Sequence, residues 1–180
     1  MKVEQLDCER MAAAKGMRVP ALKNIRAMPY EQLEPFFDKH LHKKSFAQAC
    51  AAHSDLRVLL KTAEHPGTHP DALSALAKHE DIEVLRRVAG NPNTPSDAQR
   101  ELFELQDDDI NIELAQHPKG PPDLLEKLAG VNPYIAKKVV ENPATPIAVL
   151  RKLEGHKEWY ISNAAREAVE KREAEAKTRA

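Results

Sequence analysis

The chain has 180 residues and a formal net charge of −1, with 42% hydrophobic and 31% charged residues. This composition is that of a folded globular protein and excludes a disordered chain, and no apolar run approaches the roughly 20 residues of a membrane-spanning helix. Near-neutral charge argues against a dedicated nucleic-acid binder, which usually has a marked basic excess. Residues 1–19 lack the continuous apolar stretch of a secretory signal. We therefore expect a cytoplasmic protein with no membrane segment.

The first part of the chain, residues 1–45, is expected to form an N-terminal helical cap. It contains three helix-like stretches, residues 3–15, 20–28 and 30–41. Phe36 and Phe37, near the end of the third stretch, are predicted to seal the first of the repeats that follow.

A repeated sequence occupies residues 46–165. Four blocks end in proline: VLLKTAEHP (58–66), VLRRVAGNP (84–92), INIELAQHP (110–118) and IAKKVVENP (135–143). Their prolines stand at 66, 92, 118 and 143, so the period is 26, 26 and 25 residues, and His or Asn precedes each. Ten residues past each proline is a leucine: Leu76, Leu102, Leu128 and Leu153. An internal period of this length indicates an array of repeats.

Each repeat is predicted to contain two short helices. Thr94-Pro95 and Thr145-Pro146 are typical of a helix start, where the threonine hydroxyl caps a free N–H. Apolar residues at helical spacing follow. The second helix ends at His-Pro or Asn-Pro, because the residue before proline disfavours helix. Neither helix can bury its apolar stripe alone, so the repeats are expected to stack into an all-α superhelical solenoid.

These blocks, followed by Thr-Pro and by LSALA (73–77) or LEKLA (125–129), resemble the leucine-rich repeat variant family. The resemblance implies a right-handed superhelix of α-helices alternating with short 3₁₀ or α segments, similar to HEAT and armadillo arrays. The best-known members of that family carry an iron–sulfur cluster on N-terminal cysteines. Because Cys8 is the only cysteine in the N-terminal segment here, no cluster is expected, and Cys50 is predicted to be a buried thiol.

The last residues, 166–180, are expected to form a charged helix or tail with Glu–Lys pairs four residues apart, such as Glu167 and Lys171. Trp159 and Tyr160, just before it, are predicted to pack on the last repeat.

Eight histidines raise a metal-site hypothesis, but a structural role is favoured. His65 and His117 alternate with Asn91 and Asn142 at one repeat position, and both residue types can hydrogen-bond the local backbone. Helix capping and solvation explain the acidic run at residues 107–109. No phosphate-binding loop and no nucleophile–histidine arrangement can be recognised, so we expect no enzyme, no cofactor and no metal.

The second helix of each repeat carries the candidate partner-binding residues. Positions six and five before the proline project away from the apolar stripe and hold two basic pairs on either side of Ile112 and Glu113. The pattern predicts a basic face for a protein partner whose acidic groups surround an apolar anchor, formed by Arg86, Arg87, Ile112, Lys137 and Lys138. The alternative is an ordinary solvated face.

Two functions remain open at this stage. The favoured one is a non-catalytic scaffold that holds a protein partner. The alternative is a nucleic-acid-binding HEAT-like protein related to the alkylpurine DNA glycosylases. That alternative requires a continuous basic surface and an aromatic pocket, whereas the basic positions here are interrupted and aromatic residues make up only 4% of the chain.

Overall fold

A computed structural model describes residues 21–179, and these residues contain helices, turns and no strand, which confirms the all-α prediction. The chain divides into two compact units, Met1–Asn93 (unit 1) and Thr94–Ala180 (unit 2). Among the described residues, no helix combines the length and the apolar character needed to cross a membrane. The predicted stretch at residues 3–15 lies outside the described residues.

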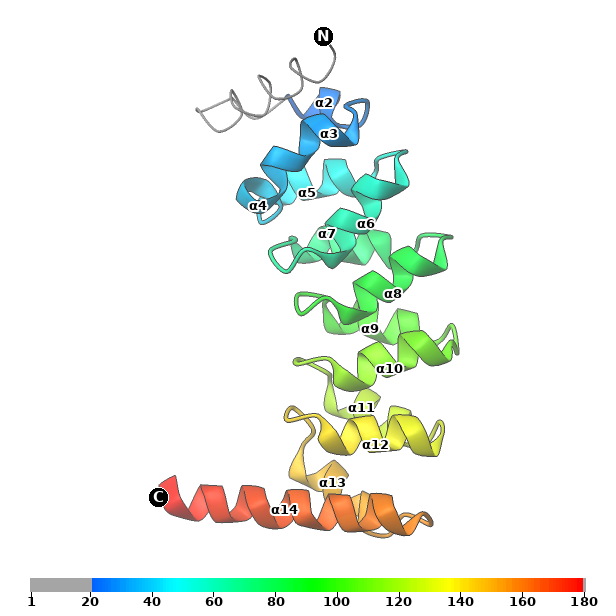
Figure 1. Cartoon of the computed structure of the whole chain (residues 1–180), viewed down its shortest axis with the longest axis vertical. Coiled ribbons are helices and arrows are strands. Elements are labelled where there is room, and N and C mark those ends of the chain that lie inside the picture. The colour runs from blue at the N-terminus through cyan, green and yellow to red at the C-terminus, as the bar shows by residue number, and fades with distance from the viewer. Residues whose placement is uncertain (1–20, 180) are drawn as a thin grey trace. The chain divides into compact units, whose positions relative to one another are not determined.

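Unit 1 begins with short helical pieces and continues with paired helices (Figure 1). The short pieces are α2 (Leu22–Ile25), α3 (Tyr30–Leu33), the 3₁₀ turn η1 (Glu34–Phe36) and α4 (Phe37–His40). The paired helices are α5 (Lys44–Ala51), α6 (Leu56–Glu64), α7 (Pro70–Leu76) and α8 (Ile82–Gly90). The stretch predicted at 30–41 is therefore not one helix, since it is interrupted by the 3₁₀ turn that contains Pro35.

Unit 2 repeats the same pairing and ends in a long helix (Figure 1). Its helices are α9 (Ser96–Phe103), α10 (Asp108–Gln116), α11 (Pro122–Ala129), α12 (Pro133–Glu141), α13 (Ile147–Leu153) and α14 (Trp159–Arg179). Helix α14 contacts both α12 and α13, and it is continuous through residue 165, where the sequence suggested the array would end.

A polar side chain caps the second helix of each repeat at its N-terminus. Asp81 accepts hydrogen bonds from the Glu83 and Val84 amides, and Asp107 accepts one from Ile110 at 2.9 Å. Asp55 and Asn132 cap α6 and α12 in the same way. These caps satisfy helix N–H groups that have no partner within the helix, and they confirm the capping role predicted within the acidic run.

The threonine of the Thr-Pro pair has a different role from the predicted one. The Thr145 hydroxyl donates to the Val139 carbonyl of the preceding helix at 2.5 Å, and Thr68 donates to Thr62 at 2.6 Å. Helix α13 begins after Pro146 and has no side-chain cap. The prediction of an N-cap is thus wrong for Thr145: its hydroxyl closes the end of one helix rather than the start of the next.

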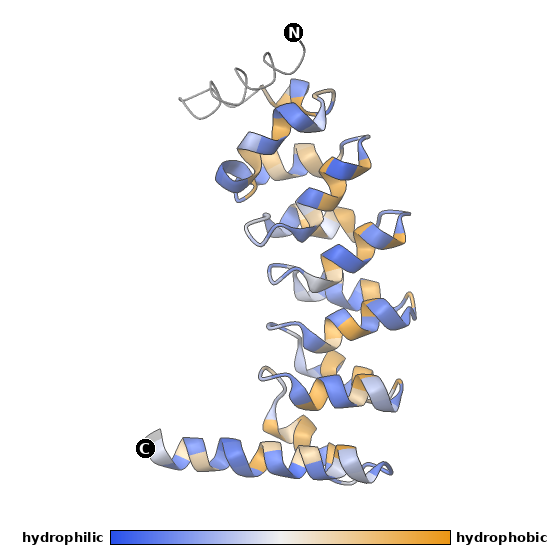
Figure 2. Ribbon diagram, viewed as in Figure 1, coloured by the Kyte–Doolittle hydropathy of each residue, from blue (hydrophilic) through white to orange (hydrophobic). Residues whose placement is uncertain are grey.

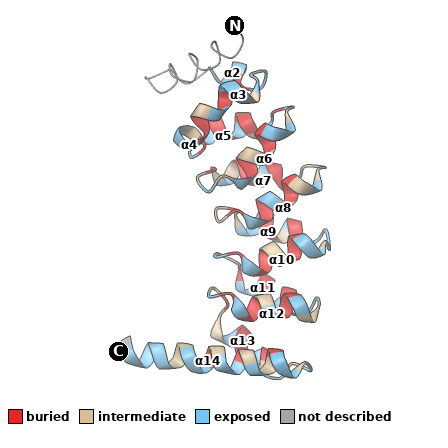
Figure 3. Cartoon of the chain, in the orientation of Figure 1, coloured by how far each residue is buried: buried red, intermediate tan, exposed pale blue. Residues whose placement is uncertain are grey.

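Within each unit the core lies between the two helices of each pair and between successive pairs, where buried residues gather (Figure 3). The leucines ten past the proline are all buried, at 0–7% exposure, as the repeat predicts: Leu76, Leu102, Leu128 and Leu153. Each pair buries a stripe that neither helix could bury alone.

Candidate partner-binding surfaces

The five residues predicted to bind a partner fall into two groups, one in each unit. Arg86 and Arg87 lie on α8 of unit 1. Ile112 lies on α10 of unit 2, and Lys137 and Lys138 lie on the neighbouring helix α12. Arg87 and Lys137 are exposed, whereas the other three are half-buried.

Carboxylates of unit 1 accompany both arginines. Arg87 pairs with Glu64 on α6 at 2.5 Å and with Glu83 one turn back at 2.9 Å. Arg86 lies 3.5 Å from the same Glu83. The hydrogen bond to Glu83, supported by the charge of Glu64, raises the pKa of Arg87. Since each arginine faces an acid, this part of the surface is closer to neutral than the sequence suggested, and the exposed pairs add little stability.

The lysines of unit 2 share a single carboxylate. Lys137 and Lys138 lie 3.7 and 3.5 Å from Glu141. The Lys138 ammonium also lies 5.5 Å from the centre of the Tyr134 ring, within the range of a cation–π contact. The α12 surface therefore keeps one excess positive charge beside an exposed aromatic ring.

A row of exposed apolar side chains was missed by sequence reasoning. In unit 1, Leu56 and Ile82 are exposed at the first residue of α6 and α8, directly after the capping aspartates. In unit 2 the corresponding turns and helix starts expose a larger set, which we call the apolar edge: Leu105 (50% exposed), Val131 (40%), Tyr134 (56%), Trp159 (73%) and Tyr160 (39%). The prediction that Trp159 and Tyr160 pack on the last repeat is wrong for Trp159, whose side chain lies mostly in solvent.

A sequence signal for the unit 1 part of this row exists in the repeat itself. The residue after the capping aspartate is apolar in both repeats of unit 1, Leu56 and Ile82, although the cap already fixes where the helix begins and the buried stripe starts later. In unit 2 the same position holds Asp108 or Pro133, so the repeat carries no such signal for the apolar edge.

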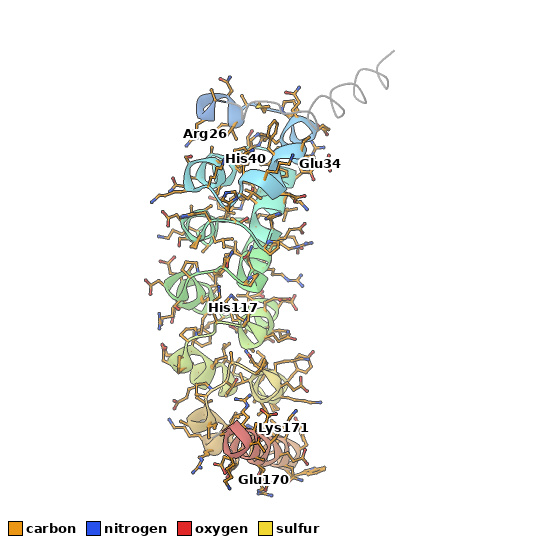
Figure 4. The ribbon with its side chains drawn as sticks, turned by 90° about the vertical axis from the view of Figure 1, so that its left-hand side faces the viewer. Arg26, Glu34, His40, His117, Glu170 and Lys171 are labelled. Carbon is orange, nitrogen blue, oxygen red and sulfur yellow. The ribbon has the colours of Figure 1, made fainter. Side chains whose placement is uncertain are left out.

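The histidines hold turns, as their alternation with asparagine predicted. Nδ1 of His65 accepts from the Gly67 amide at 3.0 Å, and Nδ1 of His117 accepts from Lys119 at 3.1 Å. The Asn91 side chain accepts from Asn93 at 3.0 Å in the same geometry. The His117 ring is buried between the helix layers of unit 2 (Figure 4). Within residues 21–179, no three His, Cys, Asp or Glu side chains gather as metal ligands would.

Asparagine at this repeat position also joins one repeat to the one before. Asn91 Nδ2 donates to the carbonyls of Ala63 and His65 at 2.6 and 2.9 Å. Asn142 Nδ2 donates to those of Ala115 and His117 at 2.7 and 3.1 Å. These carbonyls lie at the C-terminal end of a helix and lack partners within it, so each asparagine stabilises the stacking of two repeats.

Cys50 is buried, and burial raises the pKa of its thiol to about 12, so it is a packing residue and not a reactive thiol. No family model, no curated protein and no solved structure matches the chain.

Proposed function

We propose that this chain is a non-catalytic scaffold that binds a protein partner in the cytoplasm, and that its repeats form a right-handed superhelical solenoid of the leucine-rich repeat variant kind. The observation that supports binding is the exposure of large apolar side chains in the turns before the second helices, or in the first residues of those helices, in both units. A surface that a protein keeps apolar at successive repeats is suited to contact with another protein.

The basic face remains part of this proposal. We propose that Arg86 and Arg87 in unit 1, and Lys137 and Lys138 beside the apolar Ile112 in unit 2, contact a partner whose acidic groups surround an apolar anchor. The charges of the four basic residues become available to those groups after exchange from Glu83 and Glu141. Surface charges of this kind set association rate and partner choice more than affinity.

Charge reversal tests the basic face. The double variant Arg87→Glu/Lys138→Glu is expected to capture less of the partner from a lysate of the native host than the wild-type chain does. The matched control is Arg100→Glu/Lys152→Glu, which breaks inter-repeat ion pairs to Asp123 and Glu126 on the first helices of the repeats. Equal capture by both folded double variants would remove the basic face from the proposal.

The alternative of nucleic-acid binding makes an opposite prediction. A phosphate-binding surface would give binding to DNA or RNA that falls steeply with salt. The arginines and lysines of the basic face are already paired with acids. We therefore expect no salt-dependent binding to either polymer near physiological salt.

A further inference from the structure

The second helices of unit 2 present their N-terminal ends at one edge. Helices α10, α12 and α14 run in the same direction, so the turns that precede them lie on the same side (Figure 1). The Asn132 amide nitrogen at the start of α12 lies 3.4 Å from the Asp108 carboxylate at the start of α10. Helix α14 contacts α12 directly. The apolar edge is therefore built from adjacent helix ends.

Three of the five apolar-edge residues are aromatic, and aromatic side chains are the usual anchors of protein contacts. Trp159 is the only tryptophan of the chain and is 73% exposed. Apolar colour appears at the turns before α10 and α12 in Figure 2, whereas α14 is mostly hydrophilic or pale. Unit 1 offers only one aliphatic residue per repeat at this register, Leu56 and Ile82. Among residues 21–179, the largest exposed apolar side chains are thus in unit 2.

Negative charge predominates along this edge, apart from Lys137 and Lys138, which lie just beyond Tyr134 on α12. The three stretches that form the edge, residues 104–110, 130–136 and 154–162, contain one cation, Lys157. The same stretches contain six carboxylates: Glu104, Asp107, Asp108, Asp109, Glu154 and Glu158. Helix N-termini favour acidic residues in their first turn, which explains Asp107 as a cap but accounts neither for Glu104, in the turn after α9, nor for the exposed aromatic rings. An acidic rim around apolar anchors selects a positively charged occupant.

The aromatic rings of unit 2 already accept cations. Lys138 lies over Tyr134 at 5.5 Å, and Lys127 lies over Phe103 at 5.9 Å. A tryptophan ring is the best cation–π partner among side chains. Lysine or arginine of a partner could therefore contact the Trp159 ring and a carboxylate at once. Phosphate groups of nucleic acids or anionic lipids would be repelled at this edge.

We propose that the apolar edge of unit 2 binds a Lys- and Arg-rich peptide segment of a partner protein, with an apolar residue of that segment packed on Trp159 and Tyr134. This inference rests on the proposed function and adds the chemistry of the partner. It assigns the main contact to these helix ends of unit 2.

Direct titration with synthetic peptides tests the inference without a native partner. Three fluorescein-labelled peptides of equal length are used. The first is rich in Lys and Arg and carries Leu and Trp as apolar anchors. The second has Glu in place of Lys and Arg, and the third keeps Lys and Arg but has Ser in place of the anchors. We expect the first to bind more tightly than the other two, with an affinity that falls as salt rises. Stronger binding of the Glu peptide, equal binding of all three, or no binding of the first would overturn the inference.

Variants locate the site. The double variant Tyr134→Ala/Trp159→Ala is expected to lower the affinity for the first peptide about tenfold or more, because it removes two aromatic anchors. The double variant Glu104→Gln/Asp108→Asn should lower this affinity less and should make it depend less on salt concentration. The matched control is Glu170→Gln/Glu175→Gln, which removes two exposed carboxylates from the later turns of α14, where Figure 4 shows Glu170. Melting temperatures establish that each variant is folded, and equal weakening by the control would overturn the assignment to this edge.

These measurements separate the two proposals. One outcome would support the apolar edge and reject the basic face as a binding surface. In that outcome, peptide binding depends on Trp159, and charge reversal of the basic face leaves partner capture unchanged. Loss of capture on charge reversal without any peptide binding would do the opposite. Self-association of the chain that disappears in Tyr134→Ala/Trp159→Ala would make a second copy the occupant and reject the peptide.

Discussion

The two units close their outer ends by different means. Unit 1 begins with an apolar cluster in which short helices bury large side chains against α5: Ile25, Leu33, Phe36, Phe37, Leu41 and Phe46. Unit 2 ends with α14, whose Arg172 donates hydrogen bonds to the carbonyls of Thr145 and Asn142, the latter at 2.9 Å. Inside each unit, an asparagine of the next repeat donates the equivalent hydrogen bond: Asn91 to the His65 carbonyl and Asn142 to the His117 carbonyl.

This difference shows what a terminal repeat lacks. A repeat inside an array receives both an apolar face and polar donors from its neighbour. In unit 1, the described residues before α5 supply an apolar face. Unit 2 replaces the apolar face with Ile161, Ala165 and Val169, and replaces the donors with one guanidinium. A guanidinium suits this role, because it presents several N–H groups in a fixed fork.

The units also differ in how many turns a histidine ring holds. In unit 1, Nδ1 of four rings accepts from a backbone amide two residues on: His53, His65, His69 and His79. In unit 2, two rings do so, His117 and His156.

The largest expected effect is on the apolar closing cluster. Phe37 is 1% exposed, so Phe37→Ala should lower the free energy of unfolding by about 3–5 kcal/mol, as truncation of a buried phenylalanine does. Urea unfolding measures the loss. The comparison variant Val169→Ala, in the closing helix of unit 2, should cost clearly less, since it removes less buried apolar surface. Equal costs would contradict a closure of unit 1 that depends mainly on apolar burial.

Acidification should act next most strongly, and on the part of unit 1 around His40. Burial lowers the pKa of His40, and the charges of Lys43, His42 and Lys39 act in the same direction. The unfolded chain therefore binds this proton at a higher pH than the folded chain does. Stability is retained above about pH 6.5 and falls as the pH drops below it.

Amide hydrogen exchange at pH 7 and pH 5 resolves the two units. We expect protection in α5, whose Phe46 ring lies against the His40 ring, to fall more than protection in α10–α12. The variant His40→Phe removes the titrating group and should reduce the acid sensitivity. An unchanged pH response in this variant would show that His40 does not cause it.

The hydrogen bonds of Arg172 in unit 2, which we call the Arg172 clamp, should contribute less to the free energy of unfolding than the apolar cluster of unit 1. Arg172→Met keeps most of the aliphatic length but leaves the carbonyls of Asn142 and Thr145 without their charged donor. We expect a loss of about 1.5–3 kcal/mol, typical of a hydrogen bond to a charged group. The control Arg166→Met, at an exposed position that reaches only Asn163 at 3.4 Å, should be nearly neutral. Similar losses for both variants would reject the clamp.

The period of 25–26 residues and the spacing of apolar residues were sufficient to predict the helix pairs, their ends at proline and the buried leucines. These features repeat, so each copy supports the others. The interruption at Pro35 and the clamp by Arg172 occur once, and no comparison within the sequence could reveal them. The backbone turn role of His65 and His117 was predictable, because asparagine replaces histidine at that position.

The candidate partner-binding surfaces could be predicted from the sequence less well than the fold. Periodicity places Arg87 and Lys138 outside the buried stripe, but it does not report that Glu64 or Glu141 lies within reach of them. The exposure of Trp159 was mispredicted, because an aromatic residue beside the last repeat is more often buried than not. Whether a side chain at the start of α14 faces the core depends on how that helix packs on α12 and α13, which is a tertiary property.

The smallest expected effect tests the role of the Thr-Pro threonines, which both units share. Thr145 is 1% exposed and donates to Val139, as Thr68 donates to Thr62 in unit 1. Thr145→Val and Thr68→Val should each cost about 1 kcal/mol, the contribution of one hydrogen bond. Thr→Ser at either position keeps the donor and should cost less.

Aspartate separates the two possible roles of this threonine. Aspartate is a good N-cap, so Thr145→Asp would be tolerated if the side chain capped α13. A buried carboxylate cannot donate to the Val139 carbonyl and would place two acceptors face to face without a proton between them. We therefore expect Thr145→Asp to destabilise unit 2 well beyond Thr145→Val, as measured by thermal unfolding at neutral pH. The excess cost should shrink at acid pH, where the protonated carboxyl group can donate as the threonine hydroxyl does. A variant as stable as the wild-type chain would restore the capping role and reject the closure of the preceding helix by this hydroxyl.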